Sequence, residues 1–281
     1  MATTKTALFK SLKGWEATKA SLHAYSKVVG AIPRAHAEPH PKWWHISLHV
    51  FPDGIRTGAI PLSDGGSLQL VMDLRRHVLA IETGGRQAAT INLEAGFTAN
   101  ELAERLFSLL IPYGLKGPYA QEKYEDDQPR TYNPIHADTF LTTLVEIDRI
   151  FKAHRLQIGG ETGPVQFWPH GFDLAFEWFG TRQVVYEEDG DVTRYPSQLN
   201  LGWSPGEPNH PEPYFYSNPW PFEREKLLGN RLPSGAEWFT GGWEGSLLEY
   251  SALVGEPEAE QKLLAYARTV YELAAPTLTA E

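Results

Sequence analysis

Two histidines in the stretch KWWHISLHV, residues 42–50, stand at a spacing that could serve metal chemistry. His45 and His49 are four residues apart, as are the two imidazoles that a metal-binding helix presents to one ion. In a strand, however, residues four apart are separated by about 13 Å, whereas each nitrogen ligand of zinc lies about 2.1 Å from the ion. The zinc-protease motif also needs Glu directly after the first His, where this chain has Ile46. We therefore predict no metal site and no cofactor.

Alternation along the same stretch predicts a strand over Trp43 to Val50 with two different faces. Its even-numbered residues are all apolar and would anchor the core, whereas its odd-numbered residues include both histidines. The second face is either another packing layer or a wall that faces a ligand. In the latter case Trp43 would supply a flat apolar surface and His45 a proton donor or acceptor.

Residues 163–182, GPVQFWPHGFDLAFEWFGTR, form a second aromatic stretch that carries a possible acid or base. Asp173 lies on the polar side of its alternation, which is either a solvated sheet face or an acid/base group. His170 falls in a turn, where a structural role is favoured. In QLNLGW, residues 198–203, two side-chain amides share one face and could orient a polar ligand. We expect catalytic roles for His45 and Asp173, and ligand-binding roles for Trp43, His49, Gln166, Trp168, Gln198, Asn200 and Trp203.

The elements that must position these residues follow from periodicity, capping and turn signals. A helix over Ala17 to Val29 should end at Gly30 and Pro33, and Thr98 with Glu101 predicts a capped helix that stops at Gly114. Further helices are expected over 137–154 and 257–274. Strands are expected over 55–62, 68–73, 78–83, 86–93, 164–168, 172–178, 184–186, 198–203, 214–217 and 246–250.

The order helix, strands, helix occurs twice and predicts an α+β fold with two β-rich halves, each flanked by helices. The halves would be residues 1–115 and 135–281, joined by a polar linker or surface excursion over 116–134, and together they would make one compact unit. A tandem pseudo-repeat with a cleft between its halves is one interpretation of this order; chance is the other.

Composition narrows the function classes. The 281 residues carry a net charge of −10, which argues against general affinity for nucleic acid or anionic membranes. The absence of cysteine excludes disulfides, thiolate nucleophiles and Cys-ligated metals. No apolar run approaches the roughly 20 residues of a membrane span, and no signal peptide is evident. We expect a bacterial-type cytoplasmic protein.

Several motifs in order along the chain resemble domain-of-unknown-function family 5996, a bacterial family. They include WWHISLHV at 43–50, GPVQF at 163–167, FDLA at 172–175, GWSPG at 202–206 and EPYFYSNPWP at 212–221. The resemblance implies no activity. Where the family pattern has two histidines, this chain has Gln166 and Gln198, which neither titrate nor bind zinc well. The change favours ligand binding over metal chemistry.

Three functions fit these observations. An enzyme would use His45 and Asp173 beside a tryptophan platform. A non-catalytic module would bind a small polar or aromatic molecule through the same tryptophans and amides. An interaction protein would bury its exposed aromatics in a homodimer or partner interface. We expect a small-molecule ligand, with acid/base catalysis possible, and keep the homodimer as the alternative.

Overall fold

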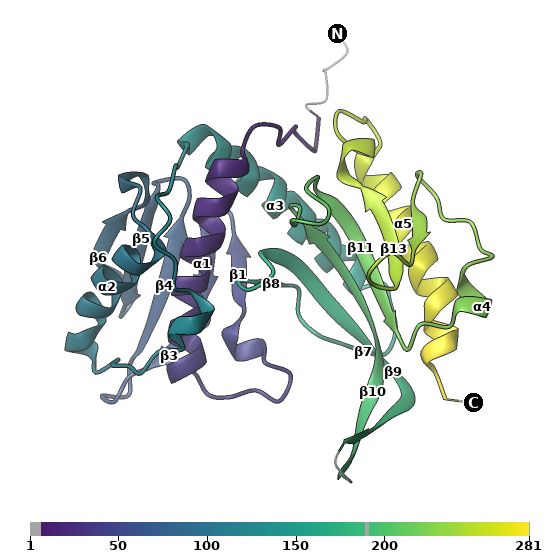
Figure 1. The fold of residues 1–281 in the computed structure, drawn as a ribbon, viewed down its shortest axis with the longest axis horizontal. Coiled ribbons are helices and arrows are strands. Elements are labelled where there is room, and N and C mark those ends of the chain that lie inside the picture. Colours follow the sequence, from purple (N-terminus) through teal and green to yellow (C-terminus); the bar gives the residue numbers. More distant parts are fainter. Residues whose placement is uncertain (1–6, 189–190, 281) are drawn as a thin grey trace. The chain divides into compact units, whose positions relative to one another are not determined.

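The computed structural model describes residues 7–188 and 191–280 and combines helices with antiparallel strands (Figure 1). The mixed helix and strand fold predicted from the sequence is confirmed. The helices are α1 Glu16–His36, α2 Ala99–Leu110, α3 Pro134–Arg155, α4 Arg224–Leu227 and α5 Ala259–Ala274. The strands are β1 Leu48–Phe51, β2 Gly54–Thr57, β3 Ile60–Pro61, β4 Ser67–Asp73, β5 Val78–Thr83, β6 Arg86–Asn92, β7 Glu161–Thr162, β8 Gln166–Trp168, β9 Asp173–Glu188, β10 Asp191–Ser204, β11 Tyr214–Trp220, β12 Glu237–Phe239 and β13 Gly245–Glu249.

The described residues form two compact units. The N-terminal unit comprises residues 12–145 and 166–173, and the C-terminal unit comprises 7–11, 146–165, 174–188 and 191–280. Helix α3 contributes its first part, 134–145, to the N-terminal unit and the remainder to the C-terminal unit. The segment 116–134 belongs to the N-terminal unit and contains only a short 3-10 turn, Gln121–Lys123, before α3 begins.

The N-terminal unit is built on antiparallel strands in the order β8-β1-β2-β4-β5-β6, with β3 paired to β4. Helices α1 and α2 contact each other and the sheet. The core is aliphatic along the strands, with Leu68, Leu70 and Met72 of β4 fully buried. It becomes aromatic where Phe140 of α3 meets Phe167 of β8 at 6.5 Å between ring centroids. Burial of this aliphatic and aromatic surface is the main contribution to the unit's stability.

The C-terminal unit has strands in the order β12-β13-β11-β10-β9, with β7 paired to β9. Its core is aromatic: Phe9, Phe151 and Phe215 are fully buried and in ring contact. Strands β9 and β10 are the longest of the structure, at 16 and 14 residues. The two strands expected over 172–178 and 184–186 are one continuous strand, because Phe179 and Gln183 between them both pair with β10 across a β-bulge.

Helix α1 is longer than the sequence predicts. It continues through Gly30 and Pro33 and ends at His36, so the expected stop signals do not end it. A Cβ atom built on Gly30 would lie 3.0 Å from Cγ of Pro169, so the glycine permits close packing of a loop on the helix. Its role is tertiary, which explains why a local interpretation fails.

The strand predicted over Trp43 to Val50 is wrong in its first half. Trp43 has φ 60° and ψ 15°, in the left-handed region, and Trp44–Ile46 form a 3-10 turn. Pairing begins only at Leu48, the first residue of β1. Residues 44 and 46 are thus apolar positions of a turn and not of a strand. The separation of about 13 Å between His45 and His49, which assumed that both lie on one strand, therefore no longer applies.

Local signals elsewhere are confirmed. Thr98 accepts from the backbone N–H of Glu101 and the Glu101 carboxylate accepts from the N–H of Thr98, which is the predicted capping box. Gly114 ends the following 3-10 turn with φ 78°. Strand β5 has the predicted bounds. Within residues 7–188 and 191–280, no helix is both long and apolar enough to cross a membrane.

Candidate functional site

The candidate residues divide between the two units. Six lie in the N-terminal unit, namely Trp43, His45, His49, Gln166, Trp168 and Asp173, and three lie in the C-terminal unit, namely Gln198, Asn200 and Trp203. The convergence of the two groups on one cavity stays a prediction.

Trp43 and His45 lie together on the turn that follows α1. Their ring centroids are 5.6 Å apart and the planes are inclined by 25°, so the rings stack. Cζ of Arg34, near the end of α1, lies 5.4 Å from the Trp43 ring centroid, within the range of a cation–π contact. Trp43 is 55% exposed. The left-handed turn therefore leaves Trp43 more than half exposed, with the Arg34 guanidinium over its ring.

A backbone contact determines the tautomer of His45. The N–H of His40 donates to Nδ1 of His45 at 3.1 Å, so the neutral ring carries its proton on Nε2. Partial burial, followed by the charges of Arg34 and His40, lowers the pKa of His45 below its ordinary value. At neutral pH His45 thus offers one N–H donor, while the nitrogen that could act as a base is already engaged.

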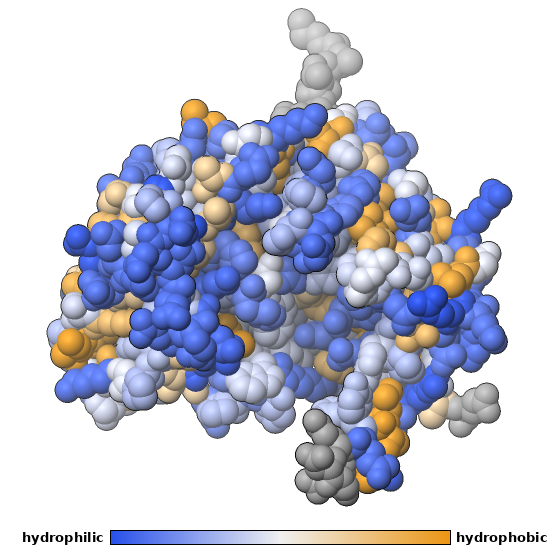
Figure 2. All heavy atoms as spheres, in the orientation of Figure 1, coloured by the Kyte–Doolittle hydropathy of each residue, from blue (hydrophilic) through white to orange (hydrophobic). Residues whose placement is uncertain are grey.

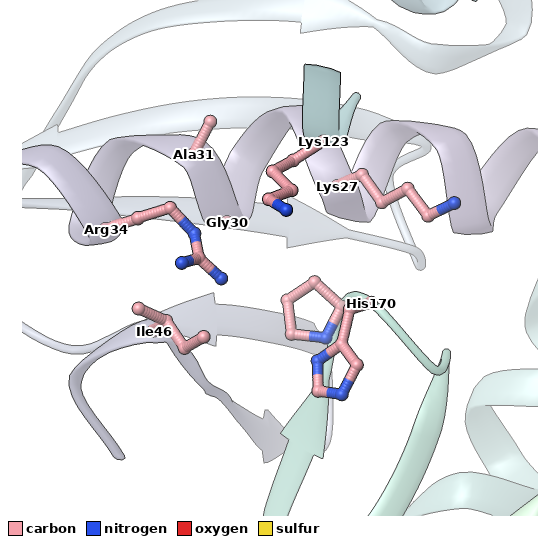
Figure 3. Close-up of a pocket in the computed structure, with 8 residues that line it drawn as sticks. Lys27, Gly30, Ala31, Arg34, Ile46, Lys123 and His170 are labelled. Atoms are coloured by element: carbon pink, nitrogen blue, oxygen red, sulfur yellow. The ribbon is translucent and has the colours of Figure 1, made fainter. Parts of the chain in front are cut away.

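A small cavity opens beside this turn, between α1 and the loop after β8 (Figure 3). Its volume is about 70 Å³. Arg34 extends below α1 toward the level of Ile46 and the His170 ring, and Lys123 lies beside the helix (Figure 3). We call this cavity the basic pocket; it is lined by Lys27, Gly30, Ala31, Arg34, Ile46, Lys123, Pro169 and His170.

The loop that forms the far wall is held in a strained conformation. Phe172 has φ 54°, in the left-handed region that bulky residues rarely adopt, and its N–H donates to the carbonyl of Trp168 at 2.8 Å. The Phe172 ring is buried against Phe140 and Phe167, with centroids 5.4 and 5.1 Å away. Core packing therefore holds the loop in place, and strained residues of this kind cluster at functional sites.

His23 of α1 supports the same loop. Its Nε2 donates to the carbonyl of His170 at 3.1 Å, and its ring stacks on Phe172 at 5.1 Å. Burial, with the positive charge of Lys27, lowers the pKa of His23 to about 4. The ring is therefore neutral at physiological pH, and its hydrogen bond to the His170 carbonyl holds the loop that forms the pocket wall.

The charges around the pocket are positive. Among the described residues, none of Lys27, Arg34 and Lys123 makes an ion pair with a carboxylate within 4 Å. His170 is exposed, yet desolvation by the surrounding protein lowers its pKa, with further lowering by Arg34 and Lys27. Burial raises the pKa of Asp126, but the backbone hydrogen bond from Gln128 and the charge of Arg130 outweigh burial and lower that pKa, and Lys27 makes a smaller contribution in the same direction. Arg34 is the cation that the pocket and the Trp43 ring have in common.

The other predicted residues of this unit take different positions. The Trp168 ring lies 5.8 Å from the His170 ring in an edge contact, so it backs the pocket wall. His49 on β1 pairs across to Arg56 on β2. Gln166 is buried, and its Oε1 has no hydrogen-bond partner among the described residues. Asp173 is half-buried at the start of β9. None of His49, Gln166 and Asp173 lines the basic pocket.

The three candidates of the C-terminal unit differ in burial. Trp203 is fully buried and lies 6.1 Å from the Tyr250 ring. Asn200 and Gln198 are half-buried on β10, and Asn200 stands opposite Glu177 of β9. Oδ1 of Asn200 has no hydrogen-bond partner among the described residues. The amides therefore share one face of the sheet, as alternation predicts, while Trp203 packs on the other.

The three cations of the pocket were not among the sequence candidates. Lys27, Gly30, Ala31 and Arg34 follow the spacing i, i+3, i+4, i+7, which places them on one helix face. Two cations that flank two small residues on one helix face are a sequence pattern that indicates a possible anion site. No local pattern indicates that Lys123 lies near them. Within the described residues no group of three or more His, Asp or Glu side chains could hold a metal ion.

The chain belongs to the family of unknown function DUF5996, whose model matches residues 10–280. The resemblance found in the sequence is thus confirmed over nearly the whole chain. No curated protein and no solved structure matches it.

Proposed function

We propose that this DUF5996 protein binds a small organic anion, a carboxylate or phosphate joined to a flat apolar group. The observation that carries the proposal is the basic pocket itself, where Arg34 and Lys123 line a cavity without carboxylate partners. An unpaired guanidinium favours a planar or tetrahedral oxyanion because its N–H groups can donate two parallel hydrogen bonds. This local excess of positive charge stands out in a chain whose net charge is −10.

Cavity size determines how much of the ligand enters. One buried water needs roughly 10–15 Å³ of cavity volume. The basic pocket, at about 70 Å³, therefore has room for on the order of five waters. That is the scale of one carboxylate or phosphate group and not of a whole metabolite. The remainder of the ligand would lie outside, on the Trp43 face that Arg34 adjoins.

The histidines fit binding better than acid/base catalysis. His45 has Nδ1 occupied by the His40 N–H, which leaves a donor at Nε2 for an anionic or polar ligand. Catalysis by His45 and Asp173 remains an expectation from the sequence, and Asp173 is not among the pocket residues. A bound ligand that the protein converts would favour catalysis after all.

Calorimetry with phenyl phosphate and inorganic phosphate tests the proposal. Phenyl phosphate should bind the full-length protein and raise its melting temperature by mass action. Arg34→Gln should weaken this binding by about 10- to 100-fold, because a hydrogen bond to a charged group contributes about 1.5–3 kcal/mol. Arg105→Gln is the matched control: it removes one positive charge from the same unit, at an arginine that stacks on Phe97 and does not line the pocket.

Equal losses in the two variants would mean that net charge alone attracts the ligand, and the pocket would then have no special role. No binding of any aryl phosphate, carboxylate or sulfonate by the folded wild-type protein would end the proposal.

We also propose, as the sequence suggests, that the chain is a tandem arrangement. The order α1, β1–β6, α2 is followed by α3, β7–β11, α4, β12–β13, α5, and this recurrence of helix, strands and helix supports it. Superposition of the two halves in an experimental structure tests the idea, and strands that cannot be matched in order would exclude it.

A further inference from the structure

Strands β9 and β10 continue beyond the rest of their sheet as a two-stranded ribbon. Strand β11 pairs with β10 only from Gln198 onward, and β7 pairs with β9 only up to Phe179. Beyond these points, over 183–188 and 191–196, the described strands pair only with each other. The ribbon is visible at the lower edge of the molecule in Figure 1. Both of its outer edges are therefore open.

One face of the ribbon carries a diagonal pattern of apolar and charged residues. Val185 stands opposite Arg194, and Glu187 stands opposite Val192. Directly opposed residues of an antiparallel pair point to the same side, as do residues two apart in one strand. The two valines thus occupy one diagonal, and Glu187 and Arg194 the other. Val185 and Val192 are 56% and 51% exposed, and Figure 2 shows apolar atoms along the ribbon.

The opposite face has partial cover from its own chain. Tyr186 stacks on Trp220 with ring centroids 6.3 Å apart, and Tyr195 makes an edge contact with the same ring at 6.5 Å. On the other face, the side chains of Val185 and Val192 are each more than half exposed. The valine face is therefore the one that remains to be covered.

Such a ribbon is not expected to persist alone in water. An isolated two-stranded hairpin is marginally stable at best, and open edges with apolar side chains invite pairing with another chain. The occupant can be inferred from charge. A face with one acid and one base across a diagonal does not favour a purely acidic or purely basic partner, but it is complementary to itself.

We propose that the valine face of the ribbon docks on the same face of a second copy of this chain. A twofold axis through the valine diagonal brings Val185 and Val192 each against its own counterpart. The same axis interchanges the two ends of the charged diagonal. Glu187 therefore lies opposite the second copy's Arg194, and Arg194 lies opposite the second copy's Glu187. An isologous contact of this kind is the usual geometry of a homodimer. Among the described side chains of this face, it leaves no like charges opposite each other.

The small size of this face implies a modest affinity. Stable interfaces bury about 1,200–2,000 Å² in total, more than two ribbon faces supply, so we expect a dissociation constant on the order of micromolar. Sedimentation equilibrium over about 1–200 µM protein at low salt measures this directly. Higher salt should weaken the dimer, because two exposed ion pairs contribute to it.

A charge-exchange cycle tests the geometry. Glu187→Arg and Arg194→Glu should each weaken the dimer by about tenfold or more, because each places like charges together twice in the symmetric contact. The double variant, with the two charges exchanged, should return to within about threefold of the wild type. Both positions of the cycle are exposed on the ribbon, and circular dichroism checks that each of the three variants keeps the fold.

The outcomes decide the proposal. A wild-type protein that is monomeric throughout the concentration range overturns it, as does a dimer that survives both single variants. A dimer that Trp43→Ala dissociates while the ribbon variants leave it intact would place the interface at the aromatic turn instead. Binding of phenyl phosphate should be the same in all ribbon variants, so failure here is separable from failure of the anion proposal.

Discussion

The basic pocket and the β9–β10 ribbon both combine apolar surface with charge, yet they do so in opposite ways. The pocket is concave, carries charges of one sign, and rests on a loop whose strained Phe172 is locked in a packed core. The ribbon is a protruding pair of strands with charges of both signs and exposed valines. The positive charges of the rigid basic pocket favour a small anion. The valine face of the ribbon carries both an acid and a base, so it is complementary to the same face of a second copy.

The largest expected effect tests the rigidity of the pocket. Phe172→Ala should lower the free energy of unfolding by about 3–5 kcal/mol, because it removes a ring buried against Phe140 and Phe167. Urea denaturation of the full-length protein measures the loss. Phe51→Ala, at a phenylalanine that is 41% exposed, is the control and should cost about 1 kcal/mol or less. Similar small losses in both variants would show that the loop is not anchored by this ring.

A smaller effect depends on pH. The pKa of His23 is lowered from 6.5 to about 4 in the folded protein, so between these values the unfolded chain binds more protons. The contribution of neutral His23 is complete above about pH 6.5 and decreases as pH falls toward 4. Because the ring is half-buried, we expect a change of about 1–2 kcal/mol and not the full value of the shift.

His23→Gln isolates this contribution, since Gln keeps a donor for the His170 carbonyl and does not titrate. The difference between wild-type and variant stability should change with pH between about 6.5 and 4 and be constant above that range. His154 of the C-terminal unit, whose pKa is also lowered to about 4, mainly by burial, allows the same substitution as a comparison. A wild-type-minus-variant difference that does not vary with pH would show that His23 titrates normally.

An effect of about 1 kcal/mol is expected at the aromatic rim. Trp43→Ala should weaken phenyl phosphate binding by about fivefold, because stacking and the cation–π contact with Arg34 are lost. Inorganic phosphate, which has no apolar part, should bind as before in calorimetry. Trp243→Ala, which alters a half-buried tryptophan of the C-terminal unit, controls for general loss of indole. Equal weakening of phenyl phosphate and inorganic phosphate binding would show that Trp43 contributes to binding the anionic group and not only the apolar group.

The smallest effect concerns the ribbon. Val185→Thr keeps a β-branched side chain and should change the free energy of unfolding by no more than about 0.5 kcal/mol at monomer concentrations. The same variant should weaken the proposed dimer in sedimentation. A large loss of monomer stability would mean that the valine is already packed within its own chain, and the contrast between ribbon and pocket would disappear.

Sequence patterns predicted those elements whose signals are local. The capping box of α2 and the bounds of β5 needed only neighbouring residues to be evident. Gly30 failed as a stop signal because its role depends on Pro169, a residue far along the chain. The stretch from Trp43 failed for another reason: a left-handed residue followed by a 3-10 turn mimics the parity of a strand for four residues.

The candidate site was predictable in part for the same reason. Trp43 and His45 were found because a dense aromatic stretch is visible in one window of sequence. The pocket brings Arg34 together with Lys123 and His170, and no pattern relates residues so far apart. Charge excess is also averaged away in a chain that is acidic as a whole. Folding concentrates in one place cations that composition hides.

The turn at Trp43 also bears on how fast a ligand would bind. Its left-handed backbone and the hydrogen bond from His40 to His45 hold the indole beside Arg34 before any ligand arrives. Binding then requires no loop closure. The conformational entropy of ordering this turn is lost when the protein folds and not when the ligand binds. Association should follow a single exponential whose rate rises linearly with ligand concentration and falls with ionic strength, as for an ion drawn to a preformed charge.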